Sequence, residues 1–424
     1  MPDRVLDGLG VKSPVQHNAV STGKAAQENP KRRPQWLLLL GLFVVGINLR
    51  PALATVAPLL ESIRAETGIT LQAAGVLSTL PVLCFGLFAP LAPRLARLLP
   101  PERVVFWCFV ALVAGIAMRS LPGAAPLFSG TVLIGAAISL IMTLLPGLIK
   151  RSFTGQAANI TGFYTTTLNI GATVASGVAI PLKDLTGSWR MAQAVWLAPA
   201  ALVVFAAIAA HRRTARDGPA PHAADVRKVK GLLRSRLAWQ VALYTGLQSA
   251  LAYCVFAWLP TMLVDRGVSP LFAGFLLSLS IGAQLFTSLT GPWIATRGRD
   301  QRTAIMVLLG MTVLGFLGCL YGPLSILLPA AVLLGLGQGG TFSIANALIV
   351  LRSPDSSTAS SLSGMVQCVG YTIAAAAPLG AGLLHGASND WDGVALAFVL
   401  FALGSASAAL GAGRNLQITP QHSV

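Results

Sequence analysis

Long apolar runs dominate this sequence and restrict what it can fold into. Hydrophobic residues make up 54% of the chain and charged residues only 10%, which excludes an ordinary soluble protein. An apolar helix of about 20 residues crosses the roughly 30 Å core of a bilayer. Runs of at least that length lie at about 36–60, 71–91, 102–121, 124–149, 156–181, 189–210, 237–263, 270–296, 302–321, 323–350, 358–386 and 392–413. We therefore predict an all-α membrane protein with 12 transmembrane helices.

The basic residues indicate how these helices are oriented. The formal net charge is +16, a sign that can indicate nucleic-acid binding. However, 24 of the 30 Lys and Arg fall on one side of the predicted helices. By the positive-inside rule this side is cytoplasmic, so we predict two cytoplasmic termini and no nucleic-acid partner. Five basic residues fall in the predicted external connections: Arg64, Arg119, Lys183, Arg190 and Arg266.

One long, basic, Pro-containing connection divides the chain into two halves. We predict a disordered cytoplasmic tail (1–35), an N-terminal six-helix bundle (36–210), a basic cytoplasmic linker (211–236), a C-terminal six-helix bundle (237–413) and a second cytoplasmic tail (414–424). Residues 226–236 of the linker could form an amphipathic helix on the anionic inner leaflet.

The two halves resemble each other at an offset of about 200 residues. Gly46-Ile47-Asn48 matches Gly246-Leu247-Gln248, and the same offset relates 132–135 to 332–335. Secondary transporters are built from repeats of this kind, with the substrate at the repeat interface. We expect substrate to be recognised where the halves differ, as at Arg50, whose counterpart Ala250 is uncharged.

Arg50 is the charged residue that lies near the middle of a predicted helix. A guanidinium at that depth costs at least about 2.5 kcal/mol. The acidic residues fall in the tails or connections, or at a helix end such as Glu61, so no carboxylate is expected beside it. A small planar anion would match its fork of donors. Alternatively, Arg50 binds backbone carbonyls near Pro51 and holds the helices in register.

Polar residues at similar depth form a second candidate group. Amides supply donors and acceptors, and aromatic rings shape an apolar slot around a small solute. With Arg50, the predicted substrate-binding residues are Asn48, Tyr164, Asn169, Gln248, Gln338, Gln367 and Tyr371. Thr165 and Gln284 belong to the same polar set, and Tyr253, Trp258 and Phe342 are further candidate walls. For each residue alone, an interhelical hydrogen bond or ordinary packing is the alternative.

Groups that relay protons or catalyse reactions are scarce in the predicted helices. Proton-driven transporters usually carry titratable residues within the helix bundle, whereas His385 and Glu61 lie near outer helix ends. The sequence therefore does not decide between a facilitator, an exchanger and a symporter. The five cysteines lie in apolar runs without CxxC spacing, as core residues do. We predict no enzyme activity, no cofactor and no metal site.

Twelve helices, two similar halves and a long central connection resemble the major facilitator superfamily. That family carries a GxxxDRxGRR-type signature between helices 2 and 3, often repeated between helices 8 and 9. Residues 89–97 keep its arginines and place Pro93 at the acidic position. The second copy, 291–302, keeps Gly291, Gly298 and Arg299.

Three segments give a narrower resemblance, to the cyanate permease and 2-nitroimidazole transporter subfamily. They are Asn48-Leu49-Arg50-Pro51-Ala52, the run Ala74–Pro81, and the run Gly364–Tyr371. The resemblance implies a carrier of the bacterial inner membrane that moves small, often anionic or planar nitrogenous solutes. We expect it to be a monomer. The leading hypothesis is alternating access around Arg50. A multidrug-type exporter of the same superfamily and a non-transporting membrane sensor are the alternatives.

Overall fold

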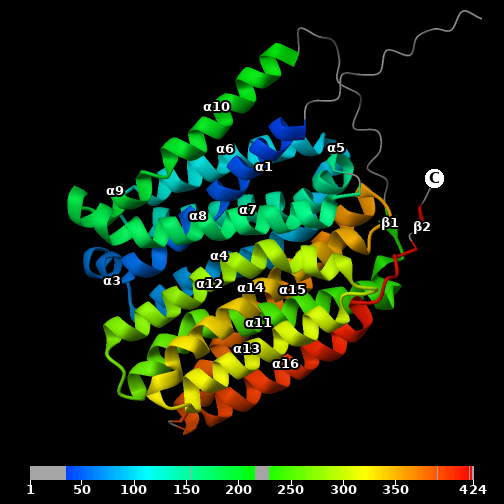
Figure 1. The fold of residues 1–424 in the computed structure, drawn as a ribbon. Helices are drawn as coiled ribbons and strands as arrows, with labels where there is room; N and C mark the ends of the chain where they lie inside the picture. Colours follow the sequence, from blue (N-terminus) through cyan, green and yellow to red (C-terminus); the bar gives the residue numbers. More distant parts are fainter. Residues whose placement is uncertain (1–34, 154, 215–228, 389, 420, 423–424) are drawn as a thin grey trace, which may run out of the picture.

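Long helices make up nearly all of residues 35–153, 155–214, 229–388, 390–419 and 421–422, which the computed structural model describes (Figure 1). The first half contains α1 (Gln35–Leu49), α2 (Pro51–Ala54), α3 (Val56–Thr67), α4 (Leu71–Phe88), η1 (Ala89–Leu91), α5 (Ala92–Leu98), α6 (Pro101–Arg119), α7 (Ala124–Ser152), α8 (Ala157–Thr186), α9 (Trp189–Ala194) and α10 (Leu197–Thr214). The second contains β1 (Val229–Lys230), η2 (Leu232–Arg234), α11 (Arg236–Asp265), α12 (Pro270–Arg297), α13 (Arg302–Tyr321), η3 (Leu324–Ile326), α14 (Leu327–Leu351), α15 (Ser356–Ser388), α16 (Asp392–Ala412) and β2 (Gln421–His422).

Within the described residues, 11 helical stretches are long and apolar enough to cross a membrane. The remaining predicted segment, 156–181, folds into α8, whose 30 residues give a length of about 45 Å. α8 is more polar than the others because it carries Thr165, Thr166, Thr167 and Asn169. It packs between α1 on one side and α12 and α14 on the other, which gives these polar residues protein partners. The predicted fold class is confirmed.

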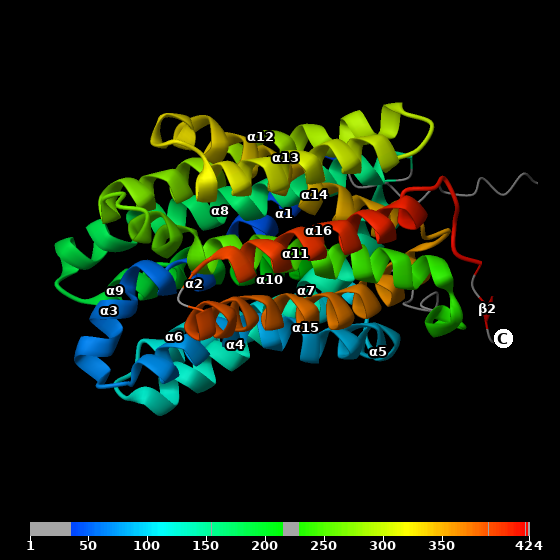
Figure 2. The ribbon, with the colours of Figure 1, turned by 90° about the horizontal axis from the view of Figure 1, so that it is seen from below.

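The two halves form separate groups of helices that meet along a shared interface. The first half lies above the second in Figure 1, and Figure 2 shows the same helices from below. At the interface, α8 contacts α12 and α14, while α15 contacts α4 and α7. The interface therefore consists of helices that are distant in sequence and come from both halves.

Contacts across this interface gather toward one end of the molecule. We call it the basic end and define it by Lys150, Arg299, Arg302 and Arg352; β1 and β2 lie there too (Figure 1). The Nζ atom of Lys150, in the last turn of α7, donates to the carbonyl oxygen of Val350 in α14 at 3.1 Å. This hydrogen bond joins the two halves directly.

Glycines on the interface helices show how the contact changes along the molecule. A Cβ atom on Gly86 of α4, Gly162 of α8 or Gly364 of α15 would lie 2.9 to 3.2 Å from atoms of the other half. Farther from the basic end, Gly75, Gly177 and Gly380 of the same three helices have nothing within 4 Å of that position. Close approach of small residues lets helices pack tightly. The halves are thus packed at the basic end and lose these contacts toward the opposite end.

The linker differs from its prediction where the structure describes it. β1 pairs antiparallel with β2, with Val229 opposite His422, and η2 is a short 3-10 turn. The amphipathic helix predicted at 226–236 is therefore wrong for 229–235. Gly231 adopts a φ of 82°, which interrupts a helix, and Ser235 caps the start of α11. Residues 1–34 and 215–228 lie outside the described residues.

Two arginines predicted to lie in connections are buried. Arg119, the last residue of α6, is 2% exposed. Arg352 is 1% exposed and donates to the carbonyl oxygen of Ala412 and to the side chain of Gln301. Burial lowers the pKa of Arg352 to about 10, and the nearby carboxylate of Asp300 opposes that shift. Both arginines help to hold their own half together.

Candidate substrate-binding site

Arg50 lies at a break in the first membrane-spanning segment. α1 ends at Leu49, and α2 begins at Pro51, which lacks a backbone N–H. The carbonyl oxygen of Arg50 accepts hydrogen bonds from the backbone of Leu53 and Ala54, at 3.0 and 2.9 Å. The Arg50 side chain is half-buried. Local sequence therefore accounts for a turn here that presents a guanidinium in mid-segment.

The guanidinium of Arg50 faces groups from both halves. Its Cζ atom lies 5.4 Å from the ring centroid of Phe342 in α14, within the range of a cation–π contact. Tyr164 in α8, Tyr253 in α11 and Tyr371 in α15 belong to the same packed cluster as Leu49 and Ala52, which flank Arg50. Among the described carboxylates, none forms a salt bridge with Arg50. The site is an aromatic cluster around one cation, at the interface.

Three aromatic side chains at this site lie close together: Phe85, Tyr253 and Tyr371. Tyr371 packs edge to face with Phe85 of α4 at 5.1 Å and lies 6.5 Å from Tyr253. Tyr164 is 3% exposed, and its buried hydroxyl has no hydrogen-bond partner in the described part of the chain. Phe85 was missed by the sequence analysis, because an apolar residue in an apolar run gives no signal.

Three of the predicted amides are already hydrogen-bonded. Asn48 donates to the carbonyl oxygen of Val44 in its own helix at 2.8 Å. Gln248 donates to the carbonyl oxygen of Thr245 and the hydroxyl of Ser249, also in its own helix. Asn169 donates across the interface to the hydroxyl of Ser288 in α12 at 3.0 Å. None of these hydrogen bonds goes to the aromatic cluster.

The other two amides keep unused polar atoms. Gln338 accepts from Gln284 at 3.4 Å, but its own Nε2 is buried without a partner among the described residues. Gln367 donates to Ser363 at 3.0 Å, and its buried Oε1 has no partner there either. Gln367 precedes Tyr371 by one helical turn, so both lie on one face of α15. These two amides offer one donor and one acceptor.

A strip of hydroxyls crosses the interface beside this cluster. The hydroxyls of Thr165 in α8 and Ser343 in α14 are 3.0 Å apart, and Ser343 also donates to the carbonyl oxygen of Ser288. With the bond from Asn169, this strip joins α8 to α12 and α14. The spacing of Thr165 and Asn169, four residues apart on α8, is the signal in the sequence; the serines gave none.

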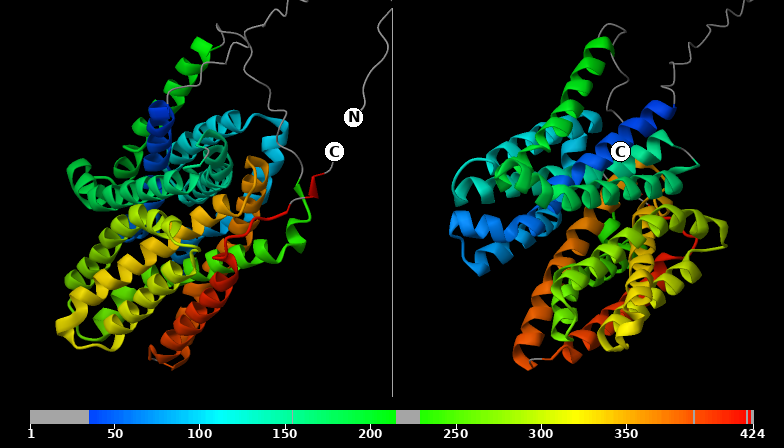
Figure 3. Two further views of the ribbon diagram at one scale, coloured as in Figure 1. Left: turned by 45° about the vertical axis from the view of Figure 1, so that its right-hand side comes forward. Right: turned by 60° about the vertical axis from the view of Figure 1, so that its left-hand side comes forward.

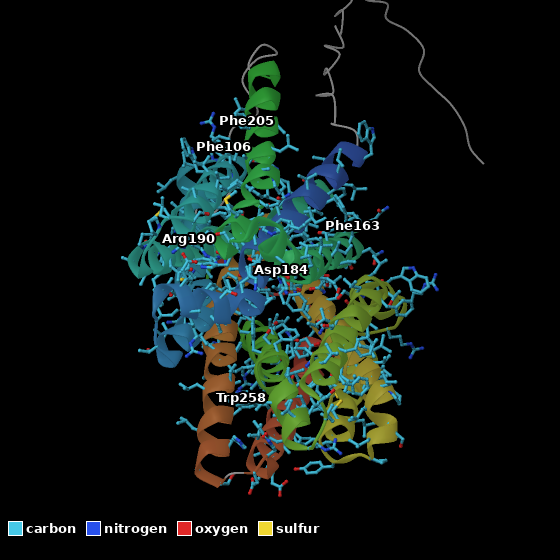
Figure 4. All side chains as sticks on the ribbon, turned by 90° about the vertical axis from the view of Figure 1, so that its left-hand side faces the viewer. Phe106, Phe163, Asp184, Arg190, Phe205 and Trp258 are labelled. Carbon is cyan, nitrogen blue, oxygen red and sulfur yellow. The ribbon has the colours of Figure 1, made fainter. Side chains whose placement is uncertain are left out.

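Other candidates lie elsewhere. Trp258 lies in the C-terminal half (Figure 4) and donates to the carbonyl oxygen of Pro378 at 2.9 Å. His385 stacks on Trp391 at 3.8 Å, near the C-terminal end of α15. The side chain of Glu61 lies outside the described residues. In the part of the chain with placed side chains, no cluster of His, Cys, Asp and Glu is arranged to hold a metal ion.

Comparison with known proteins gives one consistent result. The sequence profile of the Major Facilitator Superfamily matches residues 38–375. The chain is 36% identical over 92% of its length to the uncharacterized transporter YycB of Bacillus subtilis (strain 168), covering 96% of that protein. It is 34% identical to the 2-nitroimidazole transporter of Escherichia coli (strain K12), over 90% of this chain and 96% of the other. It is 30% identical to the cyanate transport protein CynX of the same organism, over 84% and 91%.

Solved structures agree on the fold at low sequence identity. The Escherichia coli fucose:proton symporter FucP superposes with a TM-score of 0.70 at 12% identity, over 90% of this chain and 98% of FucP. The proton:xylose symporter XylE also gives 0.70 at 12% identity, over 88% and 94%.

Proposed function

Since the chain belongs to the Major Facilitator Superfamily and is a membrane transporter of small solutes, we propose that its solute is a small anion or a planar nitrogenous compound. The observation that carries this proposal is the half-buried guanidinium of Arg50, which meets aromatic groups of both halves and pairs with no described carboxylate. A cation in that position attracts a ligand that is negative or accepts hydrogen bonds.

The groups around Arg50 suit a flat ligand. The guanidinium can donate two parallel hydrogen bonds to a carboxylate-like or nitro-like edge. Phe342, Tyr253 and Tyr371 provide ring faces and edges against which a planar solute can pack. The free Nε2 of Gln338 and Oε1 of Gln367 would read the remaining edges of the solute. Asn48, Asn169 and Gln248 would then support helix packing, since their amides are hydrogen-bonded within the protein.

Two relatives carry names that fit this chemistry. Cyanate is a small anion, and 2-nitroimidazole is a planar nitrogen heterocycle. Both can accept hydrogen bonds from a guanidinium. The names support the class of solute and leave the particular compound open.

We further propose that the solute crosses the bacterial inner membrane by alternating access, with the basic end cytoplasmic. Contacts between the halves gather at the basic end, where Lys150 donates to the carbonyl oxygen of Val350. Breaking these contacts and closing the opposite end would make the Arg50 site accessible from the other side of the membrane. Such rocking of two halves about a shared site is how folds with repeated halves work.

The test is binding and uptake with cyanate and 2-nitroimidazole as probes, using purified protein in detergent and in proteoliposomes. Hydrogen bonds to a charged group contribute about 1.5–3 kcal/mol, so Arg50→Ala should weaken binding of the recognised probe by about 10- to 150-fold. Arg414→Ala, at an exposed arginine after α16, is the control and should bind normally.

The outcomes separate the hypotheses. Equal binding by Arg50→Ala and the wild type would overturn the role of Arg50 as an anion clamp. Binding without uptake by the wild type would instead favour a sensor. Uptake of cationic dyes in place of either probe would favour a multidrug exporter.

A further inference from the structure

The buried guanidinium of Arg119 contacts the segment that carries Arg50. Its Nη1 atom donates to the carbonyl oxygen of Ala52, which lies in α2, two residues after Arg50. This bond links the end of α6 to the break between α1 and α2. Arg119 was predicted to lie in an external connection, so sequence alone gave no reason to connect it with Arg50.

Gly130 makes room for the Arg119 side chain. A Cβ atom on Gly130 of α7 would lie 2.7 Å from the Cγ atom of Arg119 and equally close to the carbonyl oxygen of Gly115. The stem of Arg119 therefore crosses α7 at a place where only a hydrogen fits. Its path toward Ala52 is determined by close packing of α6 against α7, and rotation of the stem is restricted.

Packing alone does not account for a guanidinium at this place. Arg119 is 2% exposed, and the described carboxylates form no salt bridge with it. Its Nε and Nη2 atoms are buried without partners in the described residues. Burial of an unpaired charge is costly, whereas methionine would fill similar space without that cost. The bond to Ala52 is the interaction that an apolar side chain could not make.

We propose that Arg119 is a positioning residue for Arg50, which rests on the proposed function of Arg50 in solute binding. By holding the carbonyl oxygen of Ala52, Arg119 keeps α2 in one orientation after the break at Pro51. That orientation directs the Arg50 side chain toward Phe342 and the tyrosines of the other half. Arg119 itself does not touch the solute.

The test compares Arg119→Met, Arg119→Lys and the wild type by hydrogen exchange and by binding of the probe that the wild type recognises. Without the clamp, the amides of Leu53, Ala54 and Thr55 should exchange at least tenfold faster. Probe affinity should fall about tenfold, with the maximal uptake rate changed by less than threefold. Arg119→Lys keeps one charged donor and should restore part of both properties.

The design distinguishes this proposal from the proposed function itself. Unchanged exchange at 53–55 in Arg119→Met would overturn the clamp, whatever happens to uptake. Faster exchange with unchanged probe affinity would overturn the proposal that Arg119 positions Arg50 for solute binding. In an Arg50→Ala background, Arg119→Met should cause no further loss of affinity; an additional tenfold loss would show that it acts by another route.

A second variant keeps the test decisive if Arg119→Met fails to fold. Gly130→Ala should displace the Arg119 stem, together with the α6 backbone at Gly115 and Arg119, without removing the charge. The same two readouts should change in the same direction. If Gly130→Ala folds and leaves exchange at 53–55 at the wild-type rate, the clamp is overturned. If Arg50→Ala binds the probe normally, the proposed function fails, while the exchange data still test the clamp.

Discussion

Replacement of Gly171 by alanine should separate α8 from α1 next to the candidate site. A Cβ atom at Gly171 would lie 3.0 Å from the carbonyl carbon of Ile47 and still closer to its oxygen. Ile47 lies on α1, three residues before Arg50 in the sequence. The obstacle is backbone, which cannot rotate away as a side chain can, so the helices must move apart.

The size of the effect follows from this geometry. Carbon atoms pack at about 3.5–4.0 Å, and the carbonyl oxygen of Ile47 is closer than its carbon, so relief of the clash requires a shift of roughly 1 Å. Overpacking of this kind typically costs about 1–3 kcal/mol. For a unit the size of one half, that corresponds to a fall in Tm of roughly 2–12 °C. A shift of α1 against α8 also moves Arg50 away from Tyr164, so we expect solute affinity to fall at least fivefold.

The assay is thermal unfolding in detergent, followed by probe binding, with Gly177→Ala as the matched control. Gly177 lies on the same helix and has nothing within 4 Å of its Cβ position. Because alanine favours a helix over glycine by about 0.5–1 kcal/mol, Gly177→Ala should have an equal or higher Tm. Equal Tm values for the two variants would refute the inferred close contact of α1 and α8.

Two further predictions concern the interface between the halves. Lys150→Met removes the bond to Val350 and should loosen the basic end, so that hydrogen exchange at the basic ends of α14 and α15 rises several-fold. Arg151→Met is the control, because the partner of Arg151 lies in its own half, and it should leave these exchange rates unchanged. Equal exchange rates in the two variants would contradict a role of Lys150 in closure. Thr165→Val removes a hydroxyl that is hydrogen-bonded to a serine of α14 and should destabilise the protein by about 1 kcal/mol in thermal unfolding. Thr166→Val is the control and should destabilise the protein less, because the hydroxyl of Thr166 bonds within α8. A larger loss of stability in Thr166→Val than in Thr165→Val would count against the hydroxyl strip.

Much of the fold was predictable because a bilayer allows few solutions. Apolar runs of the right length must form helices, since every backbone polar group needs a partner inside the membrane. The eleven spans found by length and composition each overlap a predicted segment, and Thr79–Leu98 extends past the predicted end at about 91. α8 shows the limit of that reasoning: its threonines lower its hydropathy, and it nevertheless lies among the other helices because α1, α12 and α14 cover it.

The candidate site was predictable only in part. Arg50 stands out in sequence because a charge in an apolar run is expensive and rare. Its surroundings do not, because Phe342 and Phe85 are ordinary apolar residues until the helices are packed. Polar residues at equal depth can face the site or their own helix, and Asn48 and Gln248 donate within their own helices.

The sequence by itself determined that this chain is a two-half helical membrane protein with one guanidinium in mid-segment, because hydrophobic length and charge are properties of local sequence. The tertiary structure alone decided which side chains meet that guanidinium and that Arg119 reaches the carbonyl oxygen of Ala52. Residues 50 and 342, or 52 and 119, become neighbours only when helices distant in sequence pack together. The size of the side chains at the points of closest approach determines how the helices pack, and the pattern of apolar residues along the sequence does not indicate which side chains meet at those points.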